Sequence, residues 1–177
     1  MSVALSILTP SIPSRLESLA LLVDKLSYQI GDGPIEHLVL VDNKRRSIGL
    51  KRDALVQAAI GRYIAFCDDD DDVSDDYVSS ILGAIESSDN VDVITFNQQV
   101  TLNDGNPFIV SHGVGNPDEE AREVDGAWIN IRRGPWHHNV WKADIAKACR
   151  FPDSMYGEDD EWCKLARARV VRGVHID

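Results

Sequence analysis

The sequence predicts an α/β fold with a mixed central sheet, and two patterns along the chain predict it. Short apolar runs rich in β-branched residues alternate with longer segments in which apolar residues recur every three or four positions. The alternation is regular up to residue 96 and then gives way to shorter β-like runs. Strands that alternate with helices pair in parallel, so we expect a sheet that is parallel at first and mixed later.

Four strands and three helices are expected in the first half of the chain. The apolar runs that predict strands lie at residues 3–9, 35–41, 63–67 and 91–96. Helical spacing of apolar residues predicts helices at residues 14–30, 48–60 and 77–85. Ser14 with Glu17 fits a capping box at the start of the first helix, and Ser47 or Ile48 opens the second.

The second half of the chain is expected to be less regular. Two short β-like runs between residues 100 and 110 flank a hairpin-type turn at residues 103–106. Residues 112–126 are rich in glycine and acidic side chains and predict a mobile loop beside the site. The remaining expected elements are a strand at 127–131, helices at 143–149 and 159–168, and a strand at 170–176.

Composition narrows the possible classes of function. The net charge of −11 disfavours a broad grip on nucleic acid or an anionic membrane, although a nucleic-acid acceptor stays open. No run is long and apolar enough for a membrane span, and the first residues lack a signal-peptide pattern, so we expect a cytoplasmic protein. The three widely spaced cysteines predict free thiols.

A run of five aspartates, residues 68–72, directly follows the third expected strand. Side chains alternate along an extended chain, so Asp68 and Asp70 would point the same way and could share a Mg²⁺, Mn²⁺ or Ca²⁺ ion. Many charge runs are only solvated loops. Ligands of α/β sheets, however, gather beyond the carboxyl ends of strands, and both this run and Asp42 follow such ends.

Short motifs occur along the chain in a recognisable order. They are SILTPS at 6–11, VD at 41–42, GLKRDAL at 49–55, GRYIAFCDDDD at 61–71 and GEDD at 157–160. With these motifs the chain resembles glycosyltransferase family 2. The resemblance implies the GT-A fold, a Rossmann-like mixed central sheet with helices on both faces in a three-layer sandwich. It also implies one domain over residues 1–177, with a nucleotide-binding half at about 1–96 and an acceptor-binding half at about 97–177.

The activity that the resemblance implies is that of a metal-dependent, inverting, non-processive hexosyltransferase. Such an enzyme moves a sugar from a nucleotide-diphosphate donor, here expected to be a UDP-sugar, to a hydroxyl of a saccharide or other acceptor. Mn²⁺ or Mg²⁺ would serve as cofactor, because a divalent cation stabilises the charge that grows on a leaving nucleoside diphosphate.

The resemblance also assigns donor-binding residues. Thr9 and the turn after it would lie along the nucleoside, and Asp42 would accept a hydrogen bond from the base. Arg52 would approach the nucleotide. Asp68 and Asp69, at the start of the aspartate run, would contact the nucleotide as well.

The metal ligands implied are Asp68, Asp70 and His175, although the aspartate run leaves the register open by one residue. At the start of the last expected helix, the resemblance implies Asp159 as the base that takes the acceptor proton. Glu158 would orient the acceptor. Asp160 is the alternative base.

The segment Trp136-His137-His138-Asn139, with Trp141, is dense in aromatic and imidazole side chains. Sugar rings stack on indole faces, so this segment could shape the acceptor or donor-sugar pocket. Packing in the core explains the tryptophans equally well.

Two other classes of function stay open. Residues 69–73 fit the DxDx[TV] motif of haloacid-dehalogenase phosphohydrolases, with Asp69 as nucleophile and Asp159 and Asp160 as later metal ligands. That motif normally follows the first strand, whereas two strand–helix units precede it here. A non-enzymatic divalent-cation module of EF-hand type would need glycine and glutamate where the chain has Val73 and Ser79.

Overall fold

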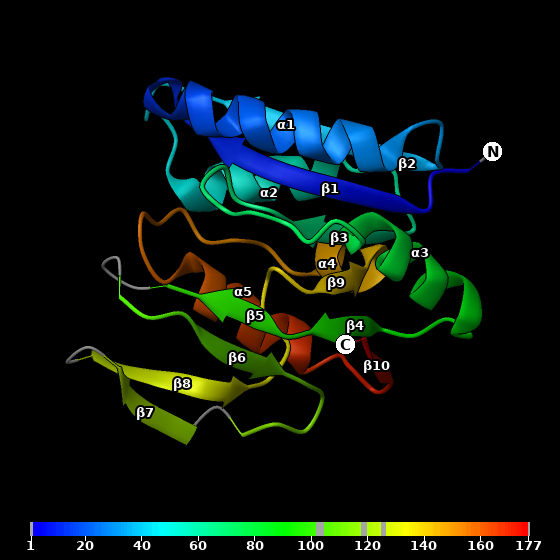
Figure 1. Ribbon diagram of the computed structural model, residues 1–177, viewed down its shortest axis with the longest axis vertical. Helices are drawn as coiled ribbons and strands as arrows, with labels where there is room; N and C mark the ends of the chain where they lie inside the picture. The colour runs from blue at the N-terminus through cyan, green and yellow to red at the C-terminus, as the bar shows by residue number, and fades with distance from the viewer. Residues whose placement is uncertain (1, 102–104, 118–119, 125–126, 177) are drawn as a thin grey trace.

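A six-stranded sheet forms the centre of the computed structural model, which describes residues 2–101, 105–117, 120–124 and 127–176 (Figure 1). Its strands, in spatial order, are β10 (Gly173–Ile176), β4 (Val93–Phe96), β9 (Val140–Lys142), β3 (Tyr63–Phe66), β1 (Leu5–Ser11) and β2 (Ile35–Val41). The pairs β1–β2, β1–β3 and β4–β10 are parallel, and β9 runs antiparallel to both of its neighbours. The predicted mixed sheet is therefore confirmed.

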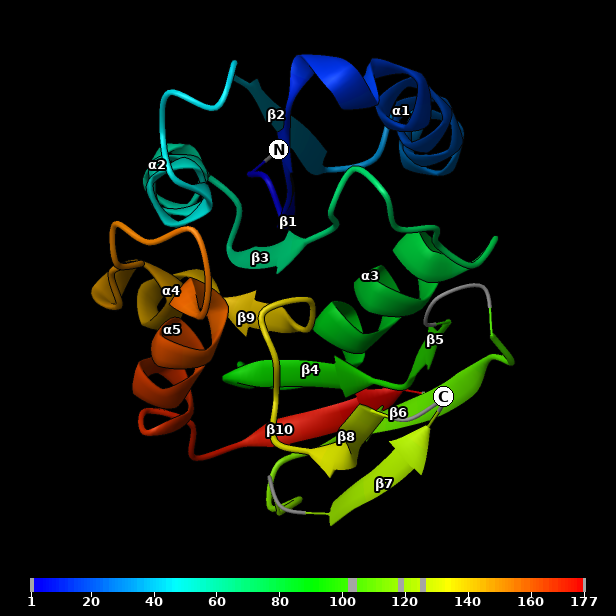
Figure 2. The same cartoon turned by 90° about the vertical axis from the view of Figure 1, so that its left-hand side faces the viewer.

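Helices cover both faces of this sheet, as Figure 2 shows. One face carries α1 (Leu16–Ile30) and α3 (Tyr77–Ser87), and the other carries α2 (Ile48–Ala58), α4 (Ala143–Ala148) and α5 (Glu158–Arg167). A separate apolar core fills the space between the sheet and each helix layer. This arrangement confirms the expected three-layer sandwich. Among the described helices, none is both long enough and apolar enough to cross a membrane.

A smaller sheet lies at one end of the large one and consists of β5 (Gln98–Val100), β6 (Phe108–His112), β8 (Ala127–Arg133) and β7 (Glu120–Val124), in that order. The expected hairpin is confirmed by the antiparallel pair β5–β6, although part of its turn lies outside the described residues. The prediction of an irregular loop over residues 112–126 is wrong in part, because β7 forms there. Its mostly charged sequence carries little strand signal and takes strand form by pairing with β8.

The sequence did not predict strand β9, because three residues are too few to show periodicity. The strand inserts between β3 and β4, and Trp141 is completely buried. The segment that enters β9 contains His137 and His138, so this insertion brings both histidines to the end of β3.

The two predicted helix starts differ in outcome. Ser47 caps α2, because its hydroxyl accepts a hydrogen bond from the Leu50 amide at 3.1 Å. The capping box at Ser14 is wrong, since α1 begins only at Leu16 and Ser14 lies in a 3₁₀ turn, Pro13–Arg15, without a side-chain cap. Proline at the start of that turn favours it, because its fixed φ suits a first helical turn.

Gly49, in the first turn of α2, is where this helix touches the loop before α5. A Cβ at this position would lie 1.9 Å from the carbonyl oxygen of Pro152 and 3.2 Å from Cβ of Glu158. The Gly49 amide also donates a hydrogen bond to the Ser154 carbonyl at 3.2 Å. Only glycine allows the two backbones to approach this closely.

We therefore expect Gly49→Ala to lower the free energy of unfolding by about 1 to 3 kcal/mol, the usual cost of overpacking. Gly83→Ala is the matched control, because a Cβ at this α3 position meets nothing within 4 Å. The control should be neutral or stabilising by up to about 1 kcal/mol. Urea unfolding of both variants checks this, and equal effects would contradict the close approach at Gly49.

Candidate active site

The carboxyl ends of β1, β2 and β3 meet at one edge of the large sheet. Ser11 ends β1, Asp42 follows β2, and the Asp42 amide donates to the Ser11 carbonyl at 3.3 Å. The Asp42 carboxylate accepts hydrogen bonds from the Lys44 and Arg46 amides, both at 3.0 Å. Asp42 thus shapes the loop after β2, and its Oδ1 lies 3.7 Å from Nζ of Lys51.

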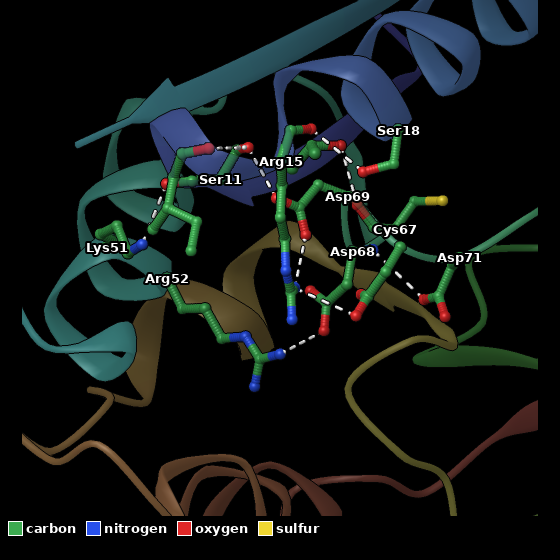
Figure 3. Close-up of polar contacts among 12 residues, drawn as sticks. Ser11, Arg15, Ser18, Lys51, Arg52, Cys67, Asp68, Asp69 and Asp71 are labelled. Carbon is green, nitrogen blue, oxygen red and sulfur yellow. Dashed lines mark hydrogen bonds and ion pairs between the residues drawn. The ribbon is translucent and has the colours of Figure 1, made fainter. Parts of the chain in front are cut away.

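The aspartate run does not form one cluster, because its side chains find different partners (Figure 3). Asp69 is buried and accepts hydrogen bonds from Ser11 Oγ at 2.6 Å and Arg15 Nη1 at 2.8 Å. Asp70 is largely exposed and pairs with the same Arg15 nitrogen at 3.0 Å. Asp72 turns away to Lys25 at 2.8 Å.

Arg52, buried in α2, bridges two carboxylates. Its Nη2 donates to Asp68 Oδ2 at 2.6 Å, and its Nη1 donates to Glu158 Oε1 at 2.7 Å. Burial acts to raise the pKa of Asp68, but contacts with His137, His138 and Arg52 outweigh it, so that pKa lies well below its ordinary value. Burial raises the pKa of Glu158, and Arg52 offsets part of this effect.

Two adjacent histidine rings, inclined to each other by 40°, also face Asp68. The ring centroids of His137 and His138 are 3.7 Å apart, and their Nε2 atoms lie 4.0 and 3.9 Å from Asp68 Oδ2. His138 Nε2 is also 3.5 Å from Asp71 Oδ2. Burial, reinforced by His138 and Arg52, lowers the pKa of His137 well below its ordinary value, so this imidazole is neutral at pH 7.

Asp68, His137 and His138 form the group of metal-type ligands found in the described part of the chain, with their ligand atoms within 4.8 Å of one another. Buried atoms of all three residues lack hydrogen-bond partners among the described residues: Asp68 Oδ1, both ring nitrogens of His137, and His138 Nδ1. These unpartnered atoms fit a divalent cation, because buried polar groups are normally paired.

The predicted catalytic pair lies at the start of α5. Glu158 is buried against Arg52, whereas Asp159 is part-exposed, with Oδ2 3.6 Å from His137 Nδ1. Asp160 is more exposed and pairs with Lys164 at 2.6 Å on the same helix. The structure thus brings Asp159, but not Asp160, to the histidines and the end of β3.

Two predicted residues lie apart from this group. Thr9 is buried, and its hydroxyl donates to the Cys67 carbonyl at 2.8 Å and lies 2.9 Å from His37 Nε2. His175 lies on β10 with Nδ1 3.0 Å from Thr95 Oγ1, beside a hollow whose lining contains none of the aspartates. Its assignment as a metal ligand stays a prediction to which this position adds no support.

A hollow of about 430 Å³ opens between the end of β1, the start of α2 and the start of α5. Five cationic side chains line it: Arg15, Lys44, Arg46, Lys51 and Arg52. The same space is also lined by three carboxylates, those of Asp69, Glu158 and Asp159. Two further lining residues, Met155 and Tyr156, lie at its rim. We call this space the basic hollow.

A second space of about 970 Å³ adjoins the aspartate run, and we call it the acidic hollow. Asp70, Asp71 and Asp72 line one wall, and Trp136 and His138 contribute to another. The sequence had associated Trp136 with either a sugar pocket or the core. Trp136 packs in the core and also borders this space, and its part in a sugar pocket stays a prediction.

Comparison with known proteins assigns the family. The model described as glycosyl transferase family 2 matches residues 18–135, which is more than half of the chain, and the chain belongs to that family. The resemblance inferred from the motifs is therefore confirmed. No curated protein matches the chain.

Solved structures of TarS from S. aureus share the fold. TarS 1–349 has a TM-score of 0.65 at 16% identity, covering 98% of this chain and 58% of that one. The complex of TarS 1–349 with UDP-GlcNAc has a TM-score of 0.63 at 12% identity and covers 98% of this chain and 56% of that one. The complex of TarS 1–349 with UDP has a TM-score of 0.65 at 14% identity and covers 98% of this chain and 57% of that one. The chain thus spans less than two thirds of these relatives, and the likeness confirms the GT-A fold.

Sequence reasoning missed several side chains of the site. Lys44, Arg46 and Tyr156 lie in loops whose sequence shows no motif, and only the fold gathers them around the basic hollow. The adjacent histidines were visible in the sequence, but their position beside Asp68 depends on the short strand β9.

Replacing Arg52 should show how strongly the bridge holds the site. We expect Arg52→Met to lower the free energy of unfolding by about 3 to 5 kcal/mol, because it leaves buried Glu158 without its cation. Adding Glu158→Gln should recover about 1 kcal/mol or more by removing the unpaired charge.

Urea unfolding of the single and double variants gives both values. Lys164→Met is the control, since the pair with Asp160 is mostly exposed, and its effect should stay below about 1 kcal/mol. Equal losses for Arg52→Met and Lys164→Met would show that the bridge contributes no more than a surface pair.

Proposed function

We propose that this glycosyltransferase moves a sugar from a UDP-sugar to an acceptor hydroxyl with inversion at the anomeric carbon, assisted by a divalent cation. The observation that carries the proposal is the basic hollow, where five cationic side chains surround a space at the carboxyl ends of the strands. Cationic groups at this edge suit a diphosphate. TarS, with the same fold, has been solved with UDP and with UDP-GlcNAc, which supports uridine as the nucleoside.

The chain's own residues divide the work of binding the donor. Lys51 is buried, with Nζ donating to the Ser11 carbonyl at 3.0 Å, so its charge is fixed at the floor of the basic hollow. Arg15 reaches the hollow from the turn after β1 and is held by Asp69. Pro10 and Ser11, which follow Thr9, line the hollow and would lie along the nucleoside.

Inversion requires one base on the side of the acceptor. Asp159 would take the proton of the acceptor hydroxyl while the oxygen forms a bond to the anomeric carbon and the bond to the diphosphate breaks. Glu158 would act through Arg52, since it is buried in that ion pair. A divalent cation held at Asp68 would stabilise the negative charge on the leaving diphosphate.

The acceptor would enter from the acidic hollow. Trp136 and His138 border it, and the Trp136 amide is fixed by Asn139 Oδ1 at 2.8 Å. An indole edge beside carboxylates suits a polyol such as a sugar. The phosphohydrolase alternative is less well supported, because its nucleophile Asp69 is 2% exposed and both of its oxygens accept hydrogen bonds.

Replacing the proposed base should separate binding from chemistry. We expect Asp159→Asn to keep UDP affinity and to lower the rate of sugar transfer about 100-fold to 10,000-fold, the usual contribution of a general base. Calorimetry with UDP and a donor-hydrolysis assay with a panel of nucleotide sugars measure the two quantities. Asp160→Asn serves as comparison and should stay near the normal rate; the reverse result would assign the base to Asp160.

Tyr156 at the rim of the basic hollow offers an aromatic face on which the nucleobase of the donor could stack. Its side chain is 89% exposed, yet its loop is fixed by hydrogen bonds between Ser154 Oγ and the backbone of Tyr156. Stacking of a base on an aromatic ring contributes about 1 to 3 kcal/mol, so Tyr156→Ala should weaken UDP binding at least about fivefold. Tyr156→Phe should not.

The control is Tyr28→Ala, because Tyr28 is 91% exposed on α1 and does not line the basic hollow. Calorimetric titration with UDP compares the three variants with the unchanged protein. Equal affinities for Tyr156→Ala and Tyr28→Ala would remove Tyr156 from the donor site while leaving the rest of the proposal in place.

A further inference from the structure

The roles proposed above leave the ring nitrogens of two adjacent histidines without a function, those of buried His137 and part-exposed His138. Neither the nucleotide nor the acceptor proton needs two imidazoles at this point. His137 is almost completely buried, and neither of its nitrogens has a hydrogen-bond partner among the described residues. Buried imidazole nitrogens without partners are uncommon, and each such group calls for an explanation.

The positions of the nitrogens are specific. Both Nε2 atoms face Asp68 Oδ2, at 4.0 Å for His137 and 3.9 Å for His138. The other nitrogen of His137, Nδ1, faces Asp159 Oδ2 at 3.6 Å. One edge of the His137 ring therefore faces Asp68, and the other faces the proposed base.

This geometry matches a common arrangement around protein-bound metals. A histidine that binds a metal through one nitrogen usually donates its other N–H to a carboxylate, which fixes the tautomer and the ring orientation. Here Asp159 would receive the Nδ1–H of His137, which leaves the lone pair of Nε2 directed toward Asp68 and His138.

The charges around the rings also favour a cation. Three carboxylates, Asp68, Asp71 and Asp159, lie within 4.0 Å of an imidazole nitrogen. Arg52 is the cationic side chain that is hydrogen-bonded to this group, and it donates to Oδ2 of Asp68. The second oxygen of Asp68 is buried and has no hydrogen-bond partner in the described ranges.

We propose that Asp68, His137 and His138 hold the divalent cation of this enzyme, and that this site selects a transition-metal ion over Mg²⁺ or Ca²⁺. Imidazole ligands favour first-row transition metals, whereas Mg²⁺ and Ca²⁺ prefer sites made of oxygen alone. His137 also links the ion to Asp159, so the ion helps to orient the base. The inference rests on the proposed function for the purpose of the ion, but the site can be tested without nucleotide.

The test uses metal-stripped full-length chain without nucleotide. Mn²⁺ binding is followed by the loss of the electron paramagnetic resonance signal of the free ion, Co²⁺ binding by visible absorption, and Mg²⁺ binding by competition. We expect one ion per chain and the affinity order Co²⁺ over Mn²⁺ over Mg²⁺, with Mg²⁺ at least about 100-fold weaker than Co²⁺.

Substitutions identify the ligands. His138→Gln should weaken Co²⁺ binding at least about tenfold, and His137→Gln should do the same. His138 is part-exposed, so its variant keeps the test informative where His137→Gln fails to fold. His112→Gln is the matched control, because this buried histidine bonds to Gln98 and lies outside the group. His175→Gln should leave Co²⁺ affinity unchanged.

The outcomes are distinct. Loss of Co²⁺ binding in His175→Gln, with His138→Gln unaffected, would overturn the histidine-pair site, as would equal affinity for Mg²⁺ and Co²⁺. Metal binding that occurs only with UDP present would also overturn it, while leaving the donor site in place. Metal binding as predicted in a protein that does not bind UDP would support the site and reject the proposed function.

Discussion

Arg52 joins two carboxylates that come from distant parts of the chain, and the site depends on this bridge. Asp68 lies 16 residues after it and Glu158 lies 106 residues after it. A buried guanidinium needs both partners, because an unpaired charge in the interior is strongly destabilising. The end of β3 and the start of α5 are therefore held together. Asp159, the residue after Glu158, reaches the histidines as a result.

Two chemically different spaces adjoin the aspartate run. The basic hollow lies on the side of α2 and carries five cationic side chains, although the whole chain has a net charge of −11. The acidic hollow is lined by Asp70, Asp71 and Asp72. Asp69 and Asp72 each form an ion pair with a cationic side chain. The aspartate run therefore does not act as one ion-binding cluster.

The sequence alone predicted those features that arise from a repeated pattern or from a short local motif. Alternating strands and helices predicted the three layers, and the motifs located Asp68, Arg52 and Glu158 at one edge. The failures have a physical cause. Strand β9 is three residues long and β7 is mostly charged, so both depend on pairing with neighbours rather than on their own propensity. His137 lies beside Asp68 only because strand β9 follows it in the chain and pairs with β3. The motif that contains Thr9 did not show that the Thr9 hydroxyl would form its hydrogen bond inside the core.

The most direct test of the central claim is a crystal structure of the chain with UDP and Mn²⁺, using anomalous scattering at the manganese edge. We expect UDP in the basic hollow, with its diphosphate beside Lys51 and Arg15, and one anomalous peak within bonding distance of Asp68. UDP bound in the acidic hollow, or a manganese peak remote from Asp68, would contradict it.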